Sequence, residues 1–306
     1  MSATCMPAGD PLTGELLKAV SRSFFLTIRW LPRAMQDGVA LGYLLARATD
    51  SVADTSSADS AKREAVLLRM GQAVAGTLDD MELKELLYEL AVPLAGAQPN
   101  PAERTLLGRF GECLRILQAM PERQQTLIRE VLATIVEGQL WDLRFFREQS
   151  AVTDDAQTHT YTYQVAGCVG QFWTSLGIET MGEDFCDTSR QQVMTEAGIR
   201  YGRGLQLVNI LRDRAEDAAR GRSYLCSPAE LWLNRAERYL HDGVDYSTRL
   251  RRFRLRFASM LPALIGLRTL ELMRRTKDER RVKIPRRSVY ACMLRAVWLS
   301  IRPRAF

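Results

Sequence analysis

The segment that decides the fold is residues 38–55, which read GVALGYLLARATDSVADT. At 3.6 residues per turn, one face of this segment carries Tyr43, Arg47, Asp50 and Asp54, spaced 4, 3 and 4 residues apart. The neighbouring positions are mostly leucine, alanine and valine. A helix with apolar residues around most of its circumference packs on several sides, so its narrow polar stripe is predicted to face an internal cavity.

The same pattern occurs a second time in residues 204–224, which read GLQLVNILRDRAEDAARGRSY. Here Gln206, Asn209, Asp213 and Asp217 follow one another at spacings of 3, 4 and 4 residues, and leucine, valine and isoleucine surround them. Solvated helix faces with incidental charges are the alternative interpretation. Because two such stripes occur, each with an arginine on or beside it, the sequence favours a pair of aspartate-bearing helices that face each other across a cavity.

Paired aspartates on a helix also indicate what the cavity binds. Carboxylates four residues apart lie about 6 Å apart along the axis and repel each other unless a cation lies between them. Oxygen ligands of this kind suit Mg²⁺, which takes one or two carboxylates together with phosphate oxygens and water. The two stripes therefore predict a clamp for a magnesium diphosphate.

The rest of the chain predicts one all-α domain over residues 1–306, with residues 1–15 as a loosely ordered N-terminus. Strand patterns are nearly absent, and apolar residues recur at helical spacing almost throughout. The spacing predicts a long helix that ends near Asp54, one helix over residues 101–120, and a break between helices around Asp242 and Gly243.

Charge and composition limit the partners. The net charge of +6 suits an anionic substrate or an anionic membrane surface. No nucleic-acid-binding motif accompanies this charge, so nucleic acid is not an expected partner. The six cysteines lack CxxC spacing, no signal peptide is apparent, and the longest charge-free apolar run near the C-terminus, residues 257–267, is too short to span a bilayer. A cytoplasmic protein is expected; peripheral membrane contact and the choice between monomer and homodimer stay open.

Four motifs resemble the squalene/phytoene synthase family of head-to-head prenyl transferases. They are SRSF at 21–24, YLLARATDSVAD at 43–54, YTYQVAGCVG at 161–170 and QLVNILRDRAEDAARGRSYL at 206–225. The first aspartate motif and the late VKI segment at 282–284 are more similar to squalene synthases than to phytoene synthases. The resemblance implies an all-α, single-domain isoprenoid synthase bundle around a central cavity, with Mg²⁺ and NADPH as cofactors.

The resemblance also implies a reaction. Two molecules of farnesyl diphosphate would condense to presqualene diphosphate, which NADPH would reduce to squalene, the activity of a farnesyl-diphosphate farnesyltransferase. The alternatives are a phytoene or dehydrosqualene synthase, or an enzyme that stops at presqualene diphosphate or hydroxysqualene, without hydride transfer. A non-catalytic relative that acts in assembly belongs to a different class. Substrate chain length and the downstream pathway (sterol, hopanoid or carotenoid synthesis) stay open.

The resemblance and the chemistry together assign the site residues. The expected metal ligands are Asp50, Asp54, Asp213, Asp217 and Glu216, where Mg²⁺ neutralises the departing diphosphate. The expected diphosphate contacts are Ser21, Arg22, Ser23, Arg47, Gln206, Asn209, Arg212 and Arg222. The expected walls of a dry prenyl cavity are Phe24, Phe25, Val165, Ala166, Gly170 and Leu207. The small residues among these suit either close helix approach or room for a ligand.

Two assignments depend on departures from the family pattern. The proton released on condensation goes to the diphosphate or to a tyrosine, Tyr43 or Tyr163, and Gln164 stands where eukaryotic squalene synthases carry a tyrosine. For NADPH, Lys283 matches a squalene synthase lysine, Arg286 or Arg287 is expected near the 2′-phosphate, and Asn209 is a further expected contact. Residues 274–287 are alternatively a basic loop on an anionic membrane surface.

Overall fold

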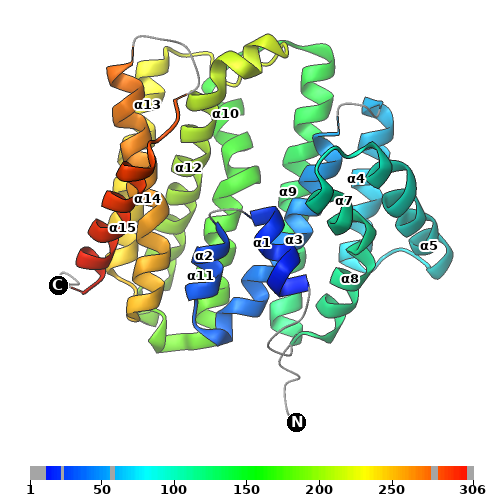
Figure 1. Cartoon of the computed structure of the whole chain (residues 1–306), viewed down its shortest axis with the longest axis horizontal. Helices are drawn as coiled ribbons and strands as arrows, with labels where there is room; N and C mark the ends of the chain where they lie inside the picture. Colours follow the sequence, from blue (N-terminus) through cyan, green and yellow to red (C-terminus); the bar gives the residue numbers. More distant parts are fainter. Residues whose placement is uncertain (1–11, 22–23, 56–58, 277–281, 302–306) are drawn as a thin grey trace. The chain divides into compact units, whose positions relative to one another are not determined.

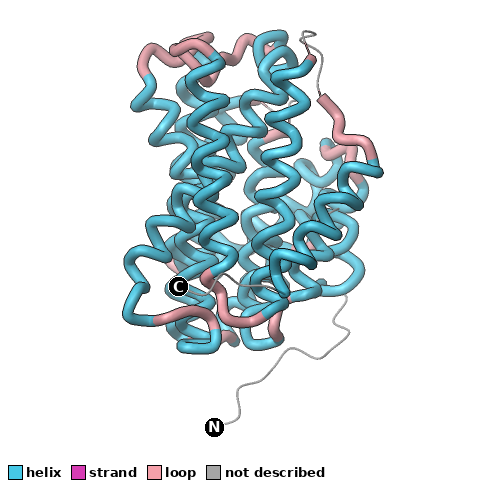
Figure 2. Tube along the Cα trace, turned by 90° about the vertical axis from the view of Figure 1, so that its left-hand side faces the viewer, coloured by secondary structure: helices cyan, strands magenta, loops and turns pink. Residues whose placement is uncertain are grey.

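The computed structural model describes residues 12–21, 24–55, 59–276 and 282–301. These residues form helices joined by short loops (Figures 1 and 2), and extended pairing among them is limited to one bridge between Ala151 and Ser223. The prediction of an all-α protein is therefore confirmed. The chain divides into two compact units, one of residues 1–29 and 33–144 and one of residues 30–32 and 145–306.

The first unit begins at the N-terminal side of the chain. Its elements are η1 (Leu12–Leu16), α1 (Leu17–Ser21), α2 (Phe24–Trp30), α3 (Arg33–Ala53), α4 (Ser60–Ala75), α5 (Asp80–Glu89), η2 (Leu90–Leu94), α6 (Ala95–Ala97), α7 (Pro101–Gly108), α8 (Phe110–Ala119) and α9 (Glu122–Glu148). The last residues of α2 and α9 belong to the second unit. Residues 12–15 start η1, so this part of the expected loose N-terminus is helical, and residues 1–11 lie outside the described residues.

Helix α3 is the central helix of this unit. It packs against α1, α4, α7 and α8. Leu41, Leu44, Leu45, Ala48 and Val52 are almost completely buried, which leaves a single polar stripe along the helix. The prediction that this helix packs on several sides is therefore confirmed.

The helix expected over residues 101–120 is interrupted at Arg109. Asn100 caps α7 by accepting a hydrogen bond from the backbone N–H of Ala102, and Pro101 is its first residue. Arg109 then leaves helical geometry, with φ −107° and ψ 12°, and its carbonyl accepts from the backbone N–H of Glu112 to start α8. Gly108, which has no side chain to favour helix continuation, precedes the break. The single-helix prediction was wrong here.

The second unit contains α12, the longest helix among the described residues. Its elements are α10 (Asp155–Thr162), η3 (Tyr163–Gly167), α11 (Cys168–Met181), η4 (Gly182–Asp184), η5 (Thr188–Arg190), α12 (Gln191–Ala219), α13 (Ala229–Thr248), α14 (Phe253–Arg275) and α15 (Arg286–Ile301). Helix α12 packs against α11, α13 and α14, and α15 covers α14 (Figure 1). The structure thus places the second aspartate motif on the best-packed helix of this unit.

Helix α13 continues through the position where a break was expected. Asp242 and Gly243 lie inside the helix, and the chain leaves helical geometry only after Thr248. A Cβ at Gly243 would lie 2.3 Å from Cδ2 of Tyr201, because the buried ring of Tyr201 packs directly on this glycine. Gly243 therefore makes room for an aromatic ring from α12, and the prediction that it ends a helix was wrong.

Candidate active site

Arg47 connects the polar stripe of α3 to α7 through two hydrogen bonds. Its Nη1 donates to Oδ2 of Asp50 at 2.5 Å, and its Nη2 donates to Oε1 of Glu103 at 2.6 Å. Asp54 follows directly after the helix and remains tied to it, because its backbone N–H donates to the carbonyl of Asp50 at 2.9 Å. Arg47, Asp50 and Asp54 therefore lie at the same end of α3, as the spacing predicts.

Glu103 is a member of this site that the sequence did not reveal. This carboxylate from α7 is only 8% exposed, and besides Arg47 it accepts from Ser51 Oγ at 2.9 Å and from Asn100 Nδ2 at 2.9 Å. Buried carboxylates are rare unless they are paired, and this one has three donors. Glu103 therefore holds the guanidinium of Arg47 in place. The sequence signal was the capped helix start at Asn100–Pro101, which puts Glu103 in the first turn of α7.

The surroundings of Asp50 disfavour its negative charge. Burial, the nearby charge of Asp54 and that of Glu103 raise the pKa of Asp50 from 3.8 to about 7, although the Arg47 guanidinium opposes this rise. The side chain nevertheless keeps 42% of its surface accessible. A carboxylate that is half-buried, repelled by a second carboxylate and still reachable is suited to receive a cation.

This raised pKa predicts a pH-dependent stability difference. Between the ordinary pKa of 3.8 and about 7 the folded protein holds a proton on Asp50 that the unfolded chain releases, so stability is lost as the pH rises through this window. Asp50→Asn cannot ionise. The free energy of unfolding of the wild type, measured by urea titration without added metal, should therefore fall relative to that of Asp50→Asn from pH 5 to pH 8.

The control for this prediction is Asp245→Asn, at an exposed position on α13. Its difference from the wild type should stay constant over the same pH range. If the wild type instead gains stability relative to Asp50→Asn as the pH rises, the raised pKa of Asp50 is contradicted.

Tyr43 of α3 and some of the site residues predicted in the N-terminal segment lie in the described part of the chain. Tyr43 Oη donates to the carbonyl of Val20 at 3.2 Å, and the ring of Phe24 lies 5.3 Å from the ring of Tyr43. Phe24 and Phe25 are half-buried. Ser21 is buried, and its hydroxyl donates to the carbonyl of Leu17 within α1. Arg22 and Ser23 lie outside the described residues, so their predicted phosphate contacts stay predictions.

The second aspartate stripe lies on the C-terminal half of α12. Arg212 binds the neighbouring Asp213 with two parallel bonds, Nε to Oδ1 at 2.8 Å and Nη2 to Oδ2 at 2.6 Å. One turn earlier, Asn209 Nδ2 donates to Oε1 of Gln206 at 3.4 Å. Asp217 is half-buried and Glu216 is exposed. As on α3, an arginine binds the first aspartate of the pair, here with two bonds instead of one.

The chain segment after α12 brings Arg222 close to aromatic rings. Gly221, with φ +74°, ends the helix, and the backbone N–H of Arg222 donates back to the carbonyl of Asp217 at 2.9 Å. The guanidinium of Arg222 lies 5.7 Å from the ring centre of Phe146, which in turn contacts the ring of Tyr224. The contact of Phe146 with Arg222 was not predicted, because the two residues are 76 residues apart in the sequence (222 minus 146).

The predicted site residues of η3 and α12 differ in burial and in polar contacts. Tyr163 Oη donates to Oε1 of Gln171 at 2.9 Å, and the guanidinium of Arg203 lies 5.4 Å from the centre of its ring. Val165 and Ala166 are half-buried, and Leu207 is buried in the core.

The sequence left open whether Gly170 allows close helix approach or makes room for a ligand, and the structure decides between the two. A Cβ at Gly170 would lie 1.9 Å from the carbonyl oxygen of Gly198 on α12, and a Cβ at Gly202 would lie 2.2 Å from the carbonyl oxygen of Ala166. On this side the small residues allow two helix backbones to touch, and they leave no room for a ligand there. Close helix approach is therefore the use that the structure shows for Gly170.

The described carboxylates occur in pairs. In the described part of the chain, no three His, Cys, Asp or Glu side chains gather closely enough to hold a metal ion by themselves. Pairs of carboxylates nevertheless fit Mg²⁺, because this ion keeps several waters and takes further oxygens from a bound phosphate. The carboxylate oxygens available here, and the carboxylates of Asp54 and Glu103 close to Asp50, are compatible with Mg²⁺ binding.

Of the residues predicted to bind NADPH, Lys283 lies just before α15 and Arg286 is its first residue. Lys283 and Arg286 are exposed, and neither forms an ion pair with a described residue. Asn209 on α12 is exposed as well. Both cationic side chains are thus available for an anionic group, which fits a 2′-phosphate without distinguishing it from other anions.

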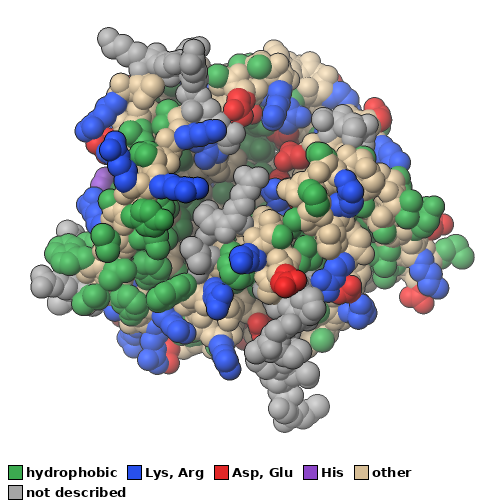
Figure 3. All heavy atoms as spheres, in the orientation of Figure 1, with side chains coloured by type: hydrophobic (Ala, Val, Ile, Leu, Met, Phe, Trp, Pro, Cys, Tyr) green, Lys and Arg blue, Asp and Glu red, His purple; other side chains and the backbone are tan. Residues whose placement is uncertain are grey.

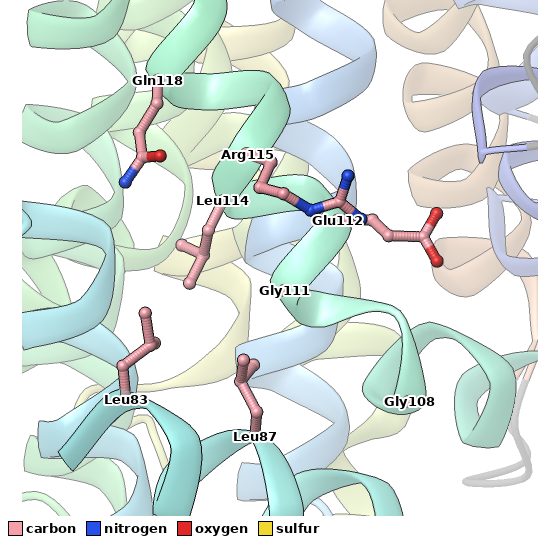
Figure 4. Close-up of a pocket in the computed structure, with 8 residues that line it drawn as sticks. All are labelled: Leu83, Leu87, Gly108, Gly111, Glu112, Leu114, Arg115 and Gln118. Atoms are coloured by element: carbon pink, nitrogen blue, oxygen red, sulfur yellow. The ribbon is translucent and has the colours of Figure 1, made fainter. Parts of the chain in front are cut away.

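A separate cavity of about 390 Å³ lies between α5 and α8 in the first unit (Figure 4). Leu83 and Leu87 point into it from α5 and Leu114 from α8, while the carboxylate of Glu112 points away. The site residues predicted from the sequence do not line this cavity. It therefore contributes nothing to the two aspartate stripes.

Solved structures share the fold of this chain. The structure of TcSQS in complex with the ligand BPH1237 matches with a TM-score of 0.70 at 22% identity, over 92% of this chain and 84% of that chain. A dehydrosqualene synthase in complex with a ligand matches with a TM-score of 0.62 at 19% identity, over 95% of this chain and 96% of that chain. The predicted isoprenoid synthase fold is confirmed.

Sequence comparisons agree with the fold. The chain is 27% identical over 226 residues to squalene synthase ERG9 of Candida albicans, covering 73% of this chain and 46% of that protein. It is 28% identical over 233 residues to a 15-cis-phytoene synthase of Synechococcus elongatus, covering 75% of this chain and 65% of that protein. The match thus spans about half the length of the squalene synthase. The family model described as squalene/phytoene synthase matches residues 17–235, and the chain belongs to this family.

Proposed function

We propose that this protein is a squalene synthase, which joins two molecules of farnesyl diphosphate head to head and then reduces presqualene diphosphate with NADPH. The observation that carries this proposal is that, in each of the two aspartate pairs, an arginine binds the first aspartate. Arg47 lies 2.5 Å from Asp50 on α3, and Arg212 lies 2.6 Å from Asp213 on α12. Membership of the family and the VKI segment at residues 282–284 support the choice of reaction.

Each arginine–aspartate pair combines the two groups that bind a metal diphosphate: a guanidinium for the phosphate oxygens and a carboxylate for the metal ion. The planar guanidinium groups of Arg47 and Arg212 can bind phosphate oxygens with two parallel hydrogen bonds. Mg²⁺, held by Asp50, Asp54, Asp213 and Asp217 with Glu216 beside the second pair, would supply the Lewis acid that neutralises the departing diphosphate. Glu103 is itself held by Ser51 and Asn100, and it fixes the side chain of Arg47. Arg47 therefore loses little side-chain freedom when the substrate binds.

The carbon skeleton needs a dry, aromatic environment. The half-buried rings of Phe24, Phe25 and Tyr43 would exclude water from the allylic cation and present their faces to it. The O–H groups of Tyr43 and Tyr163 each donate one hydrogen bond, and their oxygens keep lone pairs that can accept another. A neutral phenol cannot keep a second proton. The proton lost on condensation would therefore pass to the released diphosphate, either directly or through one of these tyrosines, whose own hydroxyl proton would then move on to the diphosphate.

A synthase without hydride transfer is the second candidate. Pro285 stands where the squalene synthase motif carries an arginine, which removes one cation from the expected NADPH contacts. An enzyme of this kind would form a conjugated triene, dehydrosqualene, from the same presqualene intermediate.

A product assay distinguishes the two candidates. Incubation with farnesyl diphosphate and Mg²⁺ should yield squalene when NADPH is present and no squalene when it is absent. A hydrocarbon product that does not change with NADPH would contradict the reductive step. Conversion of geranylgeranyl but not farnesyl diphosphate would identify a phytoene synthase. Absence of any product from both diphosphates would contradict an enzymatic role.

Lys283→Ala tests the NADPH contact directly. Because a hydrogen bond to a charged group contributes about 1.5–3 kcal/mol, the variant should raise the KM for NADPH roughly tenfold or more and leave the first condensation unchanged. The control is Lys84→Ala, at an exposed position on α5, which should behave as the wild type. An unchanged KM in Lys283→Ala would argue against this lysine.

A further inference from the structure

Helix α15 has two faces of different burial, and large apolar side chains lie on the exposed one. The inner face consists of the buried residues Ser288, Cys292, Ala296 and Ser300. The opposite face carries large apolar side chains that are between 36% and 73% exposed, namely Tyr290, Leu294, Val297, Trp298 and Ile301. Their spacing of 4, 3, 1 and 3 residues places all five on one side of the helix. We call these five residues the outer face of α15.

The outer face belongs to a firmly held helix. Cys292 and Ala296 pack into a core cluster with Phe257 and Leu264 of α14. Nε of Arg256 donates to the carbonyl of Ser300 at 2.8 Å near the end of the helix. The outer face is therefore exposed because of how α15 packs, and a contiguous exposed apolar surface of this kind usually marks an interaction site.

Positive charge surrounds this surface. Figure 3 shows a hydrophobic patch over α15, with Lys and Arg side chains around it. Arg286 and Arg287 form the exposed first turn of α15, and Arg295 is exposed on its flank. Residues 282–306 contain six basic and no acidic residues. The surface thus combines apolar and cationic side chains in one place.

We propose that the outer face of α15 docks on an anionic lipid bilayer. Tryptophan and tyrosine favour the membrane–water interface, and a helix with leucine and isoleucine between them and arginine around them lies in the interfacial plane. None of the helices in the described residues is long and apolar enough to cross a membrane, so this contact lies on the surface of the bilayer.

A second copy of the chain fits this surface less well. Two outer faces brought together would also bring together the arginines of both copies, and α15 has no acidic residue to pair with them. Anionic lipid headgroups provide the missing negative charge. The charge around the apolar residues therefore favours the bilayer.

Vesicle binding by the full-length protein tests this proposal. The protein should co-sediment with vesicles of phosphatidylcholine and phosphatidylglycerol, less with phosphatidylcholine alone, and less at high salt. The variant Leu294→Gln/Ile301→Gln keeps the net charge but removes apolar surface, so its binding should fall roughly tenfold or more. The matched control, Met81→Gln/Leu231→Gln, changes two equally exposed apolar residues elsewhere and should bind as the wild type.

Two further measurements make the result decisive. Trp298→Phe should remove the part of the tryptophan emission that shifts to the blue when anionic vesicles are added. With substrate dispersed in detergent, Leu294→Gln/Ile301→Gln should retain wild-type turnover, so loss of vesicle binding is separate from any failure of the proposed reaction. Vesicle binding that is unchanged in this variant would overturn the proposal. A dimer in light scattering that the same variant abolishes, without vesicle binding by the wild type, would overturn it in favour of self-association.

Discussion

Asp213→Asn and Asp50→Asn are each expected to lower kcat by roughly 10³-fold or more, because each removes a ligand charge from the group that neutralises the diphosphate in the transition state. Asparagine has nearly the same shape as aspartate, so the packing of α12 and α3 is kept. It has no negative charge for Mg²⁺ and no second acceptor oxygen for the arginine fork of Arg212 on Asp213. The loss therefore concerns chemistry and not folding.

The measurement is the initial rate of product formation from farnesyl diphosphate at several Mg²⁺ concentrations, with a circular dichroism melt for each variant. Higher Mg²⁺ should restore part of the activity of Asp213→Asn, since the weakened site then fills more completely. Asp245→Asn, on the exposed surface of α13, should keep the rate and the melting temperature of the wild type. Unchanged turnover in Asp50→Asn or Asp213→Asn would contradict the role of these aspartates.

Gly170→Ala should lower the free energy of unfolding by about 3 kcal/mol or more, which is at the upper end for overpacking by a single methyl group. The new Cβ would lie 1.9 Å from the carbonyl oxygen and 2.5 Å from the carbonyl carbon of Gly198. Both atoms belong to the backbone of α12, so no side chain can rotate away to make room. The helices α11 and α12 would have to separate, and their packing would be lost on both sides of the contact.

A urea titration followed by circular dichroism gives the free energy of unfolding. Gly202→Ala, whose Cβ would lie 2.2 Å from the carbonyl oxygen of Ala166, should be destabilised in the same way. Gly96→Ala is the control, because a Cβ added there would have no neighbouring atom within 4 Å and the position is helical in α6; it should be neutral or slightly stabilising. A Gly170→Ala protein as stable as the wild type would show that the two backbones do not touch here.

The site prediction was most successful where the information is local. Arg47, Asp50 and Asp54 share one end of α3 because residues three and four apart lie on one side of any α-helix, and the same holds for Asp213 and Asp217 on α12. The all-helical class follows from the same periodicity. That the two aspartate helices serve one diphosphate site stays a prediction of the sequence.

The contacts that hold these helices could not be predicted in this way. Glu103 is 56 residues from Arg47 and Phe146 is 76 residues from Arg222, and no periodic pattern links such distant positions (103 minus 47; 222 minus 146). The role of Gly243 was predicted wrongly for the same reason, since it depends on a residue far away in the sequence. This glycine contacts the ring of Tyr201, whereas the sequence shows only a residue that often ends helices.

The sequence by itself determined the all-helical class, the polar stripes and the residue types that can bind Mg²⁺ and phosphate, because helix periodicity and side-chain chemistry depend on residues close together in the chain. The tertiary structure alone decided which distant groups complete each stripe, such as Glu103 beside Arg47, and which helix faces meet. It also decided that the large apolar residues of α15 point outward, because only the packing of Cys292 and Ala296 on α14 determines which of its faces is buried.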